Sequence, residues 1–376
     1  MSQADLIPPV VAPYLAPEPF DLGQLGDALS WSGLGEYVGC FDPFSPRRAD
    51  WQHHRDHAPE RLRPLIDLFL LGRPAAPGAL PELFRPLLAG LEALGLIQGG
   101  ECGVAMTNGL AVLPVFGRWM MCHAPRANPQ FYFGDDTVAL LARLSPKAGG
   151  RCLDLCTGPG MLALHAAGIA DRVVAVEQVP ESARLARLNV DLNRLGRRIE
   201  VLEGDLYEPI TQGGFDSIVA NPPMLPFPTG LGEPAIGHGG EDGFRLTRRV
   251  LAGLPAMLRP GGAGQIIGVA LSDGAAPLGL KTLEDATGGR LDLTLSILSH
   301  QPVREDAPYL DALVATVAAA SLAEEDMVRG AYLAMMGRAG ANALCHLFIH
   351  ARHGAGQVEV IDVSSWNRAT GWRWRR

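Results

Sequence analysis

Four residues in the middle of the chain, Asn-Pro-Pro-Met at 221–224, offer hydrogen-bond acceptors suited to holding a nitrogen atom during alkylation. They follow an apolar run at 215–220 that predicts a buried strand. Proline lacks a backbone donor and has a fixed φ, so two in succession end the strand and stiffen the next turn. The Asn221 amide oxygen and the Pro222 carbonyl then become neighbouring acceptors at the edge where open α/β sheets bind ligands. Two such acceptors can hold a planar NH2 group with its lone pair directed at an electrophile.

A glycine-rich turn lies upstream, after a second apolar strand predicted at 151–155. Gly158 and Gly160 allow the backbone to approach a ligand closely, and the helix predicted at 161–167 offers free N–H groups at its start. The spacing partly fits a dinucleotide fingerprint, with alanine at the third glycine position. This motif alone does not exclude a nicotinamide oxidoreductase.

Acidic side chains end two further predicted strands. The strand at 172–176 is followed by Glu177, where a carboxylate suits ribose hydroxyls. The segment 199–207 ends in Gly-Asp-Leu, and Asp205 there can accept a hydrogen bond from an adenine amino group. Together with Asp154 and Asn221, these residues place polar side chains at four strand ends along one edge of one sheet. The Gly-Asp-Leu and Asn-Pro-Pro ends argue against the oxidoreductase.

The order of these motifs, D-L-C-T-G-P-G, V-E-Q, G-D-L and N-P-P-M, resembles that of class I S-adenosylmethionine-dependent methyltransferases. Within them it is similar to the Asn-Pro-Pro group, which methylates planar or exocyclic nitrogens. A later segment at 237–244 is similar to the Gly-Gly-x-Asp-Gly-Leu segment of release-factor glutamine methyltransferases. The resemblance covers residues 130–272 well, and residues 60–130 look like the N-terminal domain of an actinobacterial-type branch. It implies an α/β fold with a Rossmann-like domain and a seven-stranded mixed sheet.

The resemblance also implies a cofactor and roles for individual residues. The cofactor is S-adenosyl-L-methionine and the product S-adenosyl-L-homocysteine, and no metal is expected. Asn221 and Pro222 are the expected catalytic pair. The expected cofactor-binding residues are Asp154, Cys156, Thr157, Gly158, Gly160, Glu177, Gln178, Asp205, Leu206 and Asn221. The expected substrate-binding residues are Phe131, Tyr132, Phe133, Asp135, Asp136, Pro223, Met224, Glu241 and Asp242.

The methyl acceptor is less constrained than the cofactor. An amide, a guanidine, an amine and a nucleobase all present an NH2 group that the pair can hold. Two acidic doublets, at 135–136 and 241–242, flank the site in the sequence and favour a guanidinium over a phosphate. The prediction is therefore N-methylation of an amino-acid-like small molecule, for instance arginine, or of a protein side chain. The alternatives are an RNA nucleobase N-methyltransferase and a natural-product methyltransferase acting on another acceptor atom.

The length of 376 residues is enough for two domains. We expect a proline-rich extended arm at 1–20, a mostly helical lid or substrate domain at 21–128, and the methyltransferase domain at 129–376 with a helical insertion near 304–340. Segments 103–106 and 110–115 alternate around an Asn-Gly turn, which predicts a hairpin. Helices with a hairpin suggest a winged-helix-like module. A winged-helix nucleic-acid-binding protein with a vestigial cofactor domain is thus the non-enzyme alternative.

The composition of the chain limits the classes of partner and the cellular location that we expect. A net charge of −8 argues against a protein built mainly to hold nucleic acid. Six cysteines without a C-x-x-C pair indicate buried thiols rather than a disulfide framework. We expect no signal peptide and no membrane span, and hence a cytoplasmic bacterial enzyme. The basic, aromatic tail at 366–376 is expected to be a frayed terminus rather than a base-stacking surface.

Overall fold

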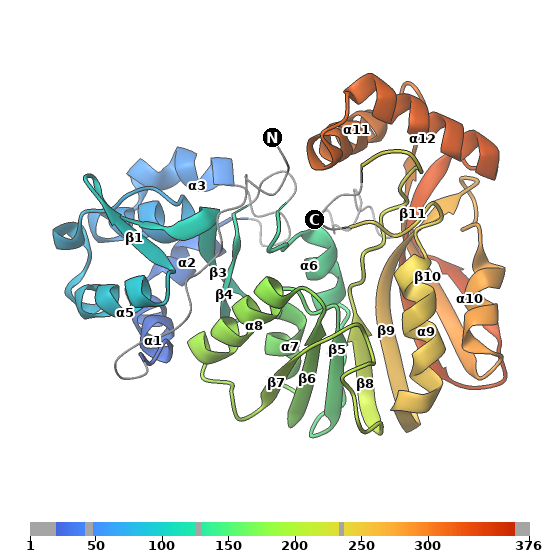
Figure 1. Ribbon diagram of the computed structural model, residues 1–376, viewed down its shortest axis with the longest axis horizontal. Coiled ribbons are helices and arrows are strands. Elements are labelled where there is room, and N and C mark those ends of the chain that lie inside the picture. Colours follow the sequence, from blue (N-terminus) through green and yellow to red (C-terminus); the bar gives the residue numbers. More distant parts are fainter. Residues whose placement is uncertain (1–19, 42–47, 125–128, 233–236, 365–376) are drawn as a thin grey trace.

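A computed structural model describes residues 20–41, 48–124, 129–232 and 237–364. An N-terminal unit lies beside a larger α/β domain, on the left in Figure 1. The predicted arm, except for its last residue, and the predicted basic tail lie outside the described residues.

The α/β domain is built on one eight-stranded sheet, in the order β12-β10-β11-β9-β8-β5-β6-β7. Strands β5 to β9 pair in parallel, whereas β11 is antiparallel to β9 and β10. The sheet has one strand more than the seven expected, because β12 pairs in parallel with β10. The bounds are β5 (Arg151–Leu155), β6 (Arg172–Glu177), β7 (Ile199–Glu203), β8 (Phe215–Ala220), β9 (Leu258–Ser272), β10 (Leu291–Pro302), β11 (Ala343–His353) and β12 (Val358–Asp362).

Both faces of this sheet are buried. On β5, Cys152 belongs to one hydrophobic cluster, whereas Leu153 and Leu155 belong to a second. Such alternation is expected because successive side chains of a strand point to opposite faces. No helix of the described residues is long and apolar enough to cross a membrane. The covering helices are α6 (Asp135–Leu141), α7 (Met161–Ala166), α8 (Pro180–Leu192), α9 (Arg245–Met257) and α10 (Leu280–Thr287).

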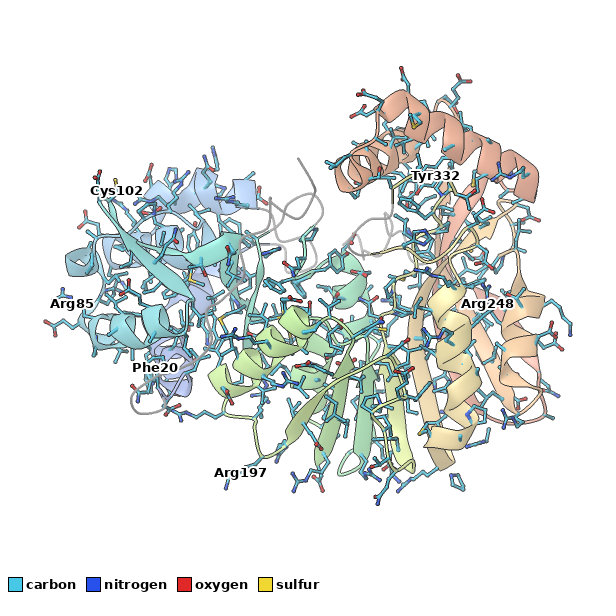
Figure 2. The ribbon with its side chains drawn as sticks, in the orientation of Figure 1. Phe20, Arg85, Cys102, Arg197, Arg248 and Tyr332 are labelled. Carbon is cyan, nitrogen blue, oxygen red and sulfur yellow. The ribbon has the colours of Figure 1, made fainter. Side chains whose placement is uncertain are left out.

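Two further helices join β10 to β11, in the segment where the sequence predicts a helical insertion. They are α11 (Pro308–Ser321) and α12 (Glu325–Ala339). They form a helical hairpin at the upper right of Figure 1, across the sheet from the N-terminal unit. Tyr332 lies on the side of α12 that faces the body of the domain (Figure 2), and its hydroxyl donates to the Pro226 carbonyl at 2.9 Å.

The N-terminal unit contains two β-hairpins. Strand β1 (Ile97–Gly100) pairs with β2 (Gly103–Met106), and β3 (Leu110–Val115) pairs with β4 (Arg118–His123). The predicted pairing of 103–106 with 110–115 is therefore wrong. The tight turn of the second hairpin lies at Phe116-Gly117, where both residues have positive φ as a two-residue hairpin turn requires.

Short helices make up the rest of this unit. Two stretches of this mostly helical unit, at 60–70 and 82–93, are not continuous helices. They consist of short α, 3-10 and π turns, with prolines at or inside the pieces. The α-helical pieces are α1 (Gly23–Ser32), α2 (Leu34–Gly39), α3 (Arg48–His54), α4 (Arg63–Leu65) and α5 (Leu88–Ala93).

Two asparagines, Asn189 on α8 and Asn193 at its C-cap, hold the N-terminal unit against the sheet domain. Asn189 accepts from the Met121 N–H at 2.7 Å and donates to the Met121 carbonyl at 2.9 Å. Asn193 makes the same pair of bonds with Trp119, at 3.0 and 2.7 Å. Asn189 also donates to the Pro159 carbonyl of the glycine-rich turn at 2.8 Å. The asparagine amides thus satisfy the outer edge of β4, which would otherwise carry unpaired backbone groups.

Candidate active site

A cavity of about 1330 Å³ follows the carboxyl edge of the sheet. Its lining extends from Asp205, after β7, past Glu177 and Asn221, to His346 on β11. The volume exceeds the ~300–1,000 Å³ that is usual for small-molecule sites. The cavity therefore has room for a nucleotide-like cofactor and for part of a second molecule.

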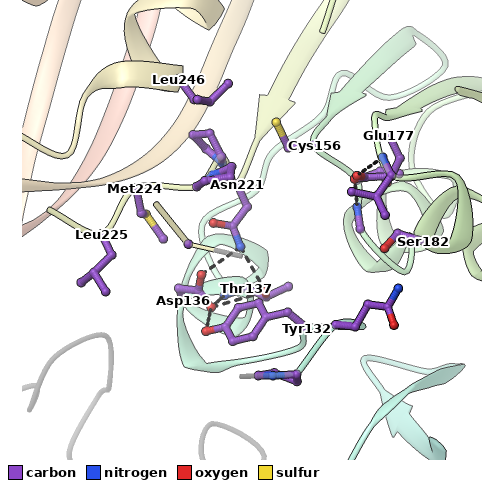
Figure 3. A pocket seen from close by; sticks show the side chains of 18 of the residues that line it. Tyr132, Asp136, Thr137, Cys156, Glu177, Ser182, Asn221, Met224, Leu225 and Leu246 are labelled. Carbon is purple, nitrogen blue, oxygen red and sulfur yellow. Dashed lines mark hydrogen bonds between the residues drawn. The ribbon is translucent and has the colours of Figure 1, made fainter. Parts of the chain in front are cut away.

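Asn221 lies near the middle of this lining, directly after β8. Its amide nitrogen donates to Asp136 Oδ2 and to Thr137 Oγ1, both at 3.1 Å. Tyr132 donates its hydroxyl hydrogen to Asp136 Oδ1 at 2.7 Å. Figure 3 shows Asp136, Thr137 and Tyr132 on the nitrogen side of the Asn221 amide.

The Asp136 carboxylate fixes which way the Asn221 amide points. An ionised carboxylate only accepts hydrogen bonds, so the atom that faces it must be the amide nitrogen. The Asn221 carbonyl oxygen then points the other way. It is buried and has no hydrogen-bond partner in the described part of the chain. A buried acceptor without a partner is unfavourable unless a ligand supplies a donor.

Burial raises the pKa of Asp136, and the hydrogen bonds from Tyr132, Asn221 and Thr137 act in the opposite direction. Burial and the nearby Asp136 charge raise the pKa of the Tyr132 phenol well above its ordinary value. Tyr132 therefore stays protonated and keeps donating to the carboxylate. The hydrogen bonds thus oppose the effect of burial and favour the charged form of Asp136.

Glu177 closes the glycine-rich turn from the neighbouring strand. One carboxylate oxygen accepts from the Gly158 N–H at 2.8 Å and the other from the Val179 N–H at 2.9 Å. A carboxylate offers further lone pairs beyond these two bonds, so it can also accept from hydroxyl groups of a ligand. Gly158 has a φ of 55°, and a Cβ built there meets no atom within 4 Å. The turn is thus open where a ligand would approach it.

Asp154 lies beneath the turn and is not part of the cavity lining. It is fully buried, accepts from the Thr157 hydroxyl, and has one carboxylate oxygen without a partner among the described residues. Burial raises its pKa to about 7, while the bond from Thr157 acts against this shift. Gly160 is also outside the lining. A Cβ there would stand 3.3 Å from the Ala186 Cβ, so this glycine packs the turn onto α8.

Asp205 lines the far end of the cavity. Its Oδ2 accepts from Arg249 at 2.8 Å, which leaves the carboxylate partly exposed and paired on one side. Leu206 beside it has a φ of 52°, an unusual backbone conformation for a residue with a large side chain. Backbone strain of this kind often occurs at ligand-binding sites.

The segment 237–244 supports the Asn-Pro-Pro turn through its backbone. The Leu225 N–H donates to the Gly237 carbonyl at 2.8 Å, and the Gly239 N–H donates back to the Leu225 carbonyl at 2.9 Å. A Cβ at Gly239 would lie 2.5 Å from the Met224 carbonyl carbon, and one at Gly243 would lie 2.1 Å from the Val269 oxygen. Glycine is required at both positions by this close approach.

The structure separates the predicted residues into two groups. Those that line the cavity are Tyr132, Asp136, Cys156, Thr157, Gly158, Glu177, Gln178, Asp205, Leu206, Asn221, Pro222, Pro223 and Met224. Those outside its lining are Phe131, Phe133, Asp135, Asp154, Gly160, Glu241 and Asp242.

The expectation that both acidic doublets face the acceptor is wrong for three of the four carboxylates. Asp135 stands outside the lining, at the first position of α6. Glu241 accepts from Arg338 at 2.9 Å and from Thr229 at 3.2 Å. Asp242 accepts from Arg248 and from the Phe244 N–H. Only Asp136 faces the cavity, and it holds Asn221. The N-cap residue of α6 is Gly134, so neither Asp135 nor Asp136 caps this helix.

Phe131 and Phe133 also lie away from the main cavity. Phe131 is buried against His123, with ring centroids 4.8 Å apart. Phe133 lines a second cavity of about 210 Å³ in the N-terminal unit. Tyr132 between them faces Asn221, so the segment alternates as an extended chain does.

Several residues that line the cavity belong to no motif in the sequence. Thr137 accepts a hydrogen bond from Asn221 but is marked only by its position after the acidic doublet. His346 lies on β11 and hydrogen-bonds Ser299 at 2.8 Å. Burial and the nearby His300 lower its pKa to about 3, so it is neutral near pH 7. Tyr309 packs edge-on to His346, with ring centroids 6.2 Å apart. Only the tertiary fold brings these distant segments together.

A parallel core with the strand order 7-6-5-8-9, a glycine-rich turn after the first strand and acidic residues at the next two strand ends defines a class I methyltransferase. The family "Methyltransferase small domain" matches residues 133–270. The chain belongs to the class I S-adenosylmethionine-dependent methyltransferases of the Asn-Pro-Pro group, and S-adenosylmethionine is its cofactor.

Curated relatives agree with this assignment. The chain is 36% identical over 142 residues to a ribosomal protein uL3 glutamine methyltransferase of Bradyrhizobium diazoefficiens, covering 35% of this chain and 44% of that protein. It is 32% identical over 150 residues to a putative protein N5-glutamine methyltransferase of Methanocaldococcus jannaschii, covering 38% and 74%. It is 34% identical over 134 residues to a release factor glutamine methyltransferase of Moorella thermoacetica, covering 33% and 47%. The chain thus spans less than half the length of two of these three relatives.

Solved structures similar to this one include a Thermus thermophilus 16S rRNA N2 G1207 methyltransferase with AdoMet and guanosine. That structure has a TM-score of 0.35 and 23% identity, and the match covers 52% of this chain and 55% of the other. A Methanocaldococcus jannaschii tRNA m1G37 methyltransferase has a TM-score of 0.37 and 12% identity, with 68% and 61% covered.

The residues present fit S-adenosylmethionine. The edge of the sheet offers a glycine turn open to the cavity at Gly158, a carboxylate with spare lone pairs at Glu177, and a second carboxylate at Asp205. These donors and acceptors suit the polar amino-acid, ribose and adenine parts of the cofactor.

Proposed function

We propose that this enzyme transfers a methyl group to the side-chain amide nitrogen of a glutamine in a protein. The orientation of the Asn221 amide carries the proposal. Its nitrogen is held by Asp136 and Thr137, and its carbonyl oxygen is buried without a partner. Such an oxygen can accept one N–H of an incoming NH2 group, and the Pro222 carbonyl is the proposed acceptor for the other.

S-adenosylmethionine supplies the electrophilic methyl group when bound. The protein's own task is to hold the acceptor nitrogen and to exclude water. In a free amide, the nitrogen lone pair is delocalised into the carbonyl group. Two hydrogen bonds from the NH2 group to Asn221 and Pro222 would restrain its rotation and raise the electron density on nitrogen. The gain comes from fixed position and polarisation, so no strong base is needed. As the nitrogen gains the methyl group, S-adenosylhomocysteine would be left and the nitrogen would give up one N–H proton, which can pass to water by way of the oxygen that holds it.

An amide is favoured over a guanidinium by the charges that surround the site. The carboxylates expected to pair with a guanidinium are occupied, Glu241 by Arg338 and Asp242 by Arg248. Asp136 faces the cavity, but three donors already use it. The remaining acceptor-side walls are largely apolar, with Met224, Leu225, Phe227 and Val269 among them. A neutral amide suits such walls better than a cation does.

Relatives support the same acceptor. Three that match this chain are named as glutamine methyltransferases, one acting on ribosomal protein uL3 and one on a release factor. The segment 237–244 that supports the Asn-Pro-Pro turn also resembles the Gly-Gly-x-Asp-Gly-Leu segment of release-factor glutamine methyltransferases. We extend the acceptor type, a glutamine amide, to this chain and leave its protein partner to experiment.

Calorimetry and mass spectrometry together test this function. We expect saturable binding of S-adenosylmethionine and S-adenosylhomocysteine by the full chain. With the cofactor present, glutamine-containing peptides should gain the mass of one CH2 unit on the glutamine, and matched asparagine peptides should not. Modification of free arginine, or of adenine in RNA, with no modification of any glutamine peptide, would overturn the proposed acceptor and leave the methyltransferase assignment intact.

A further inference from the structure

The α11–α12 hairpin is part of the cavity wall rather than a separate appendage. Its α12 helix is tied to the loop that follows the Asn-Pro-Pro turn, by Tyr332 to the Pro226 carbonyl and by Arg338 to Glu241. The residues of α11 that line the cavity are Tyr309, Ala315, Thr316, Val317 and Ala320. The hairpin thus borders the half of the cavity that lies beyond Asn221 from the cofactor residues.

The face of α11 that meets the cavity carries small, uncharged side chains. Ala315 and Thr316 of the cavity lining are exposed there, and Ala312 and Ala319 are exposed beside them. Small side chains on a helix let another backbone approach closely, whereas the opposite side of α11 is buried in the core through Leu310 and Val314. An extended polypeptide could lie along this face without displacing any large side chain.

The tip of the hairpin has a different character. Leu322 is 79% exposed and Met327 is 59% exposed, far more than expected of large apolar side chains without a partner. Between them stand three exposed carboxylates, Glu324, Glu325 and Asp326. None of the three forms an ion pair with another described residue, unlike Asp311 on α11, which pairs with Arg329.

This mixture of charge and apolar surface selects among partners. Adjacent carboxylates raise a negative potential that attracts lysine and arginine and repels phosphate. Leu322 and Met327 offer apolar contacts, and methionine adapts to varied shapes. A basic polypeptide satisfies both features, whereas an RNA strand satisfies neither.

We propose that the α11–α12 hairpin is the docking surface for the acceptor polypeptide, which lies along α11 while its basic residues bind the acidic tip. The proposal rests on the glutamine methyltransferase function proposed above. It explains why the cavity is larger than the cofactor requires and why the α11–α12 insertion shares the wall beyond Asn221 with strands β9 and β11. It also predicts a preference for glutamines that have basic neighbours in the chain.

The test uses the full-length protein and three synthetic peptides that differ only around one glutamine. The flanking residues are lysine in the first peptide, alanine in the second and glutamate in the third. A tip variant carries Glu324→Lys, Glu325→Lys and Asp326→Lys. A control variant with the same change in net charge carries Glu200→Lys, Asp285→Lys and Glu359→Lys, which are exposed acids on other elements.

The wild type should methylate the lysine-flanked peptide with the highest kcat/KM. The tip variant should lose about tenfold in kcat/KM for that peptide at low salt, through a higher KM, and the loss should shrink as salt rises. Affinity for S-adenosylmethionine should not change in either variant. Thr316→Arg, on the inner face of α11, should lower kcat/KM for all three peptides because it obstructs the path.

Distinct results would overturn the two proposals. Equal activity on all three peptides, or equal losses in the tip and control variants, would refute the docking surface while the glutamine function stands. Failure of the wild type to methylate any glutamine peptide would refute the glutamine function and the docking surface with it. Methylation of RNA with a steep salt dependence would place a different class of acceptor in the cavity.

Discussion

The two ends of the cavity satisfy their polar groups in different ways. At the cofactor end, Glu177 accepts from two backbone N–H groups and Asp205 is paired with Arg249. At the proposed acceptor end, the Asn221 carbonyl oxygen is buried between largely apolar walls and has no hydrogen-bond partner among the described residues. A ligand at the first end adds to bonds that already exist, whereas a ligand at the second end supplies the one bond that is missing.

This difference predicts how mutations distribute their effects. Losses at the cofactor end should be moderate and should appear as weaker binding, because several groups share the task. Substitutions at the proposed acceptor end should lower kcat strongly, because few groups there hold the acceptor nitrogen. Four substitutions test this contrast.

Asn221→Ala should have the largest effect. It removes the acceptor oxygen whose orientation Asp136 fixes, so kcat should fall by about 10²–10³-fold, the usual loss for one preorganised hydrogen-bonding group. Affinity for S-adenosylmethionine should fall far less. Single-turnover methyl transfer and calorimetry measure the two quantities. If binding and kcat fell by similar factors, the separation of the two ends would be refuted.

Asp136→Asn should come next. The asparagine can donate as well as accept, so the Asn221 amide is no longer forced to present its oxygen. We expect kcat to fall by roughly 10–100-fold with little change in cofactor affinity. Asp135→Asn is the matched control, because Asp135 is adjacent but outside the lining. Full activity in Asp136→Asn would show that the carboxylate does not orient Asn221.

Glu177→Gln should act on binding instead. It weakens the acceptor shared by Gly158, Val179 and the proposed ribose hydroxyls, and the dissociation constant for S-adenosylmethionine should rise about tenfold. At saturating cofactor, kcat should stay near that of the wild type. Glu203→Gln on the next strand is the control, since that carboxylate is half-exposed and pairs with Arg187. An unchanged dissociation constant would remove Glu177 from the cofactor site.

Asp154→Asn should change stability with pH rather than activity directly. The pKa of Asp154 is raised to about 7 in the folded protein and is about 3.9 in an unfolded chain. Between these values the folded state keeps a proton that the unfolded state has lost, so this group lowers stability as pH rises from about 4 to 7. The variant lacks that decline.

Relative to the wild type, Asp154→Asn should therefore gain roughly 1–4 kcal/mol of unfolding free energy across this pH range. Urea unfolding without cofactor at several pH values measures the gain. Asp285→Asn, an exposed carboxylate on α10, is the control. Parallel pH profiles for wild type and Asp154→Asn would contradict the raised pKa.

Local sequence predicts the scaffold of the site well. Strand β8 has the predicted bounds, and the parallel strands end at the residues that the motifs marked, because apolar runs and turn residues are local signals. Strand β9 shows a limit of such signals, because it continues through a Pro-Gly-Gly sequence at 260–262 that would be expected to end a strand. The sequence forms a bulge instead, since Phe215 pairs with Leu258 and Ser217 with Ala263.

Side-chain partnerships were not predictable in the same way. The orientation of Asn221 depends on Asp136, which is 85 positions away in the chain. Neighbours in the sequence also separate, since Asp135 and Asp136 differ by one position on a helix and only the second faces the cavity. The expected role of the second acidic doublet could not be checked from the sequence for a similar reason. Its carboxylates pair with arginines of other elements, Glu241 with Arg338 and Asp242 with Arg248.

The asparagine pair at 189 and 193 has a consequence for how this enzyme can be divided. Asn189 bonds simultaneously to a strand of the N-terminal unit and to the turn proposed to hold the cofactor. Removing the first 128 residues would strip a fully buried amide of two of its bonds and expose the side of α8 that now receives β4. A truncated catalytic domain should therefore bind its cofactor poorly even though every residue proposed to touch that cofactor is retained.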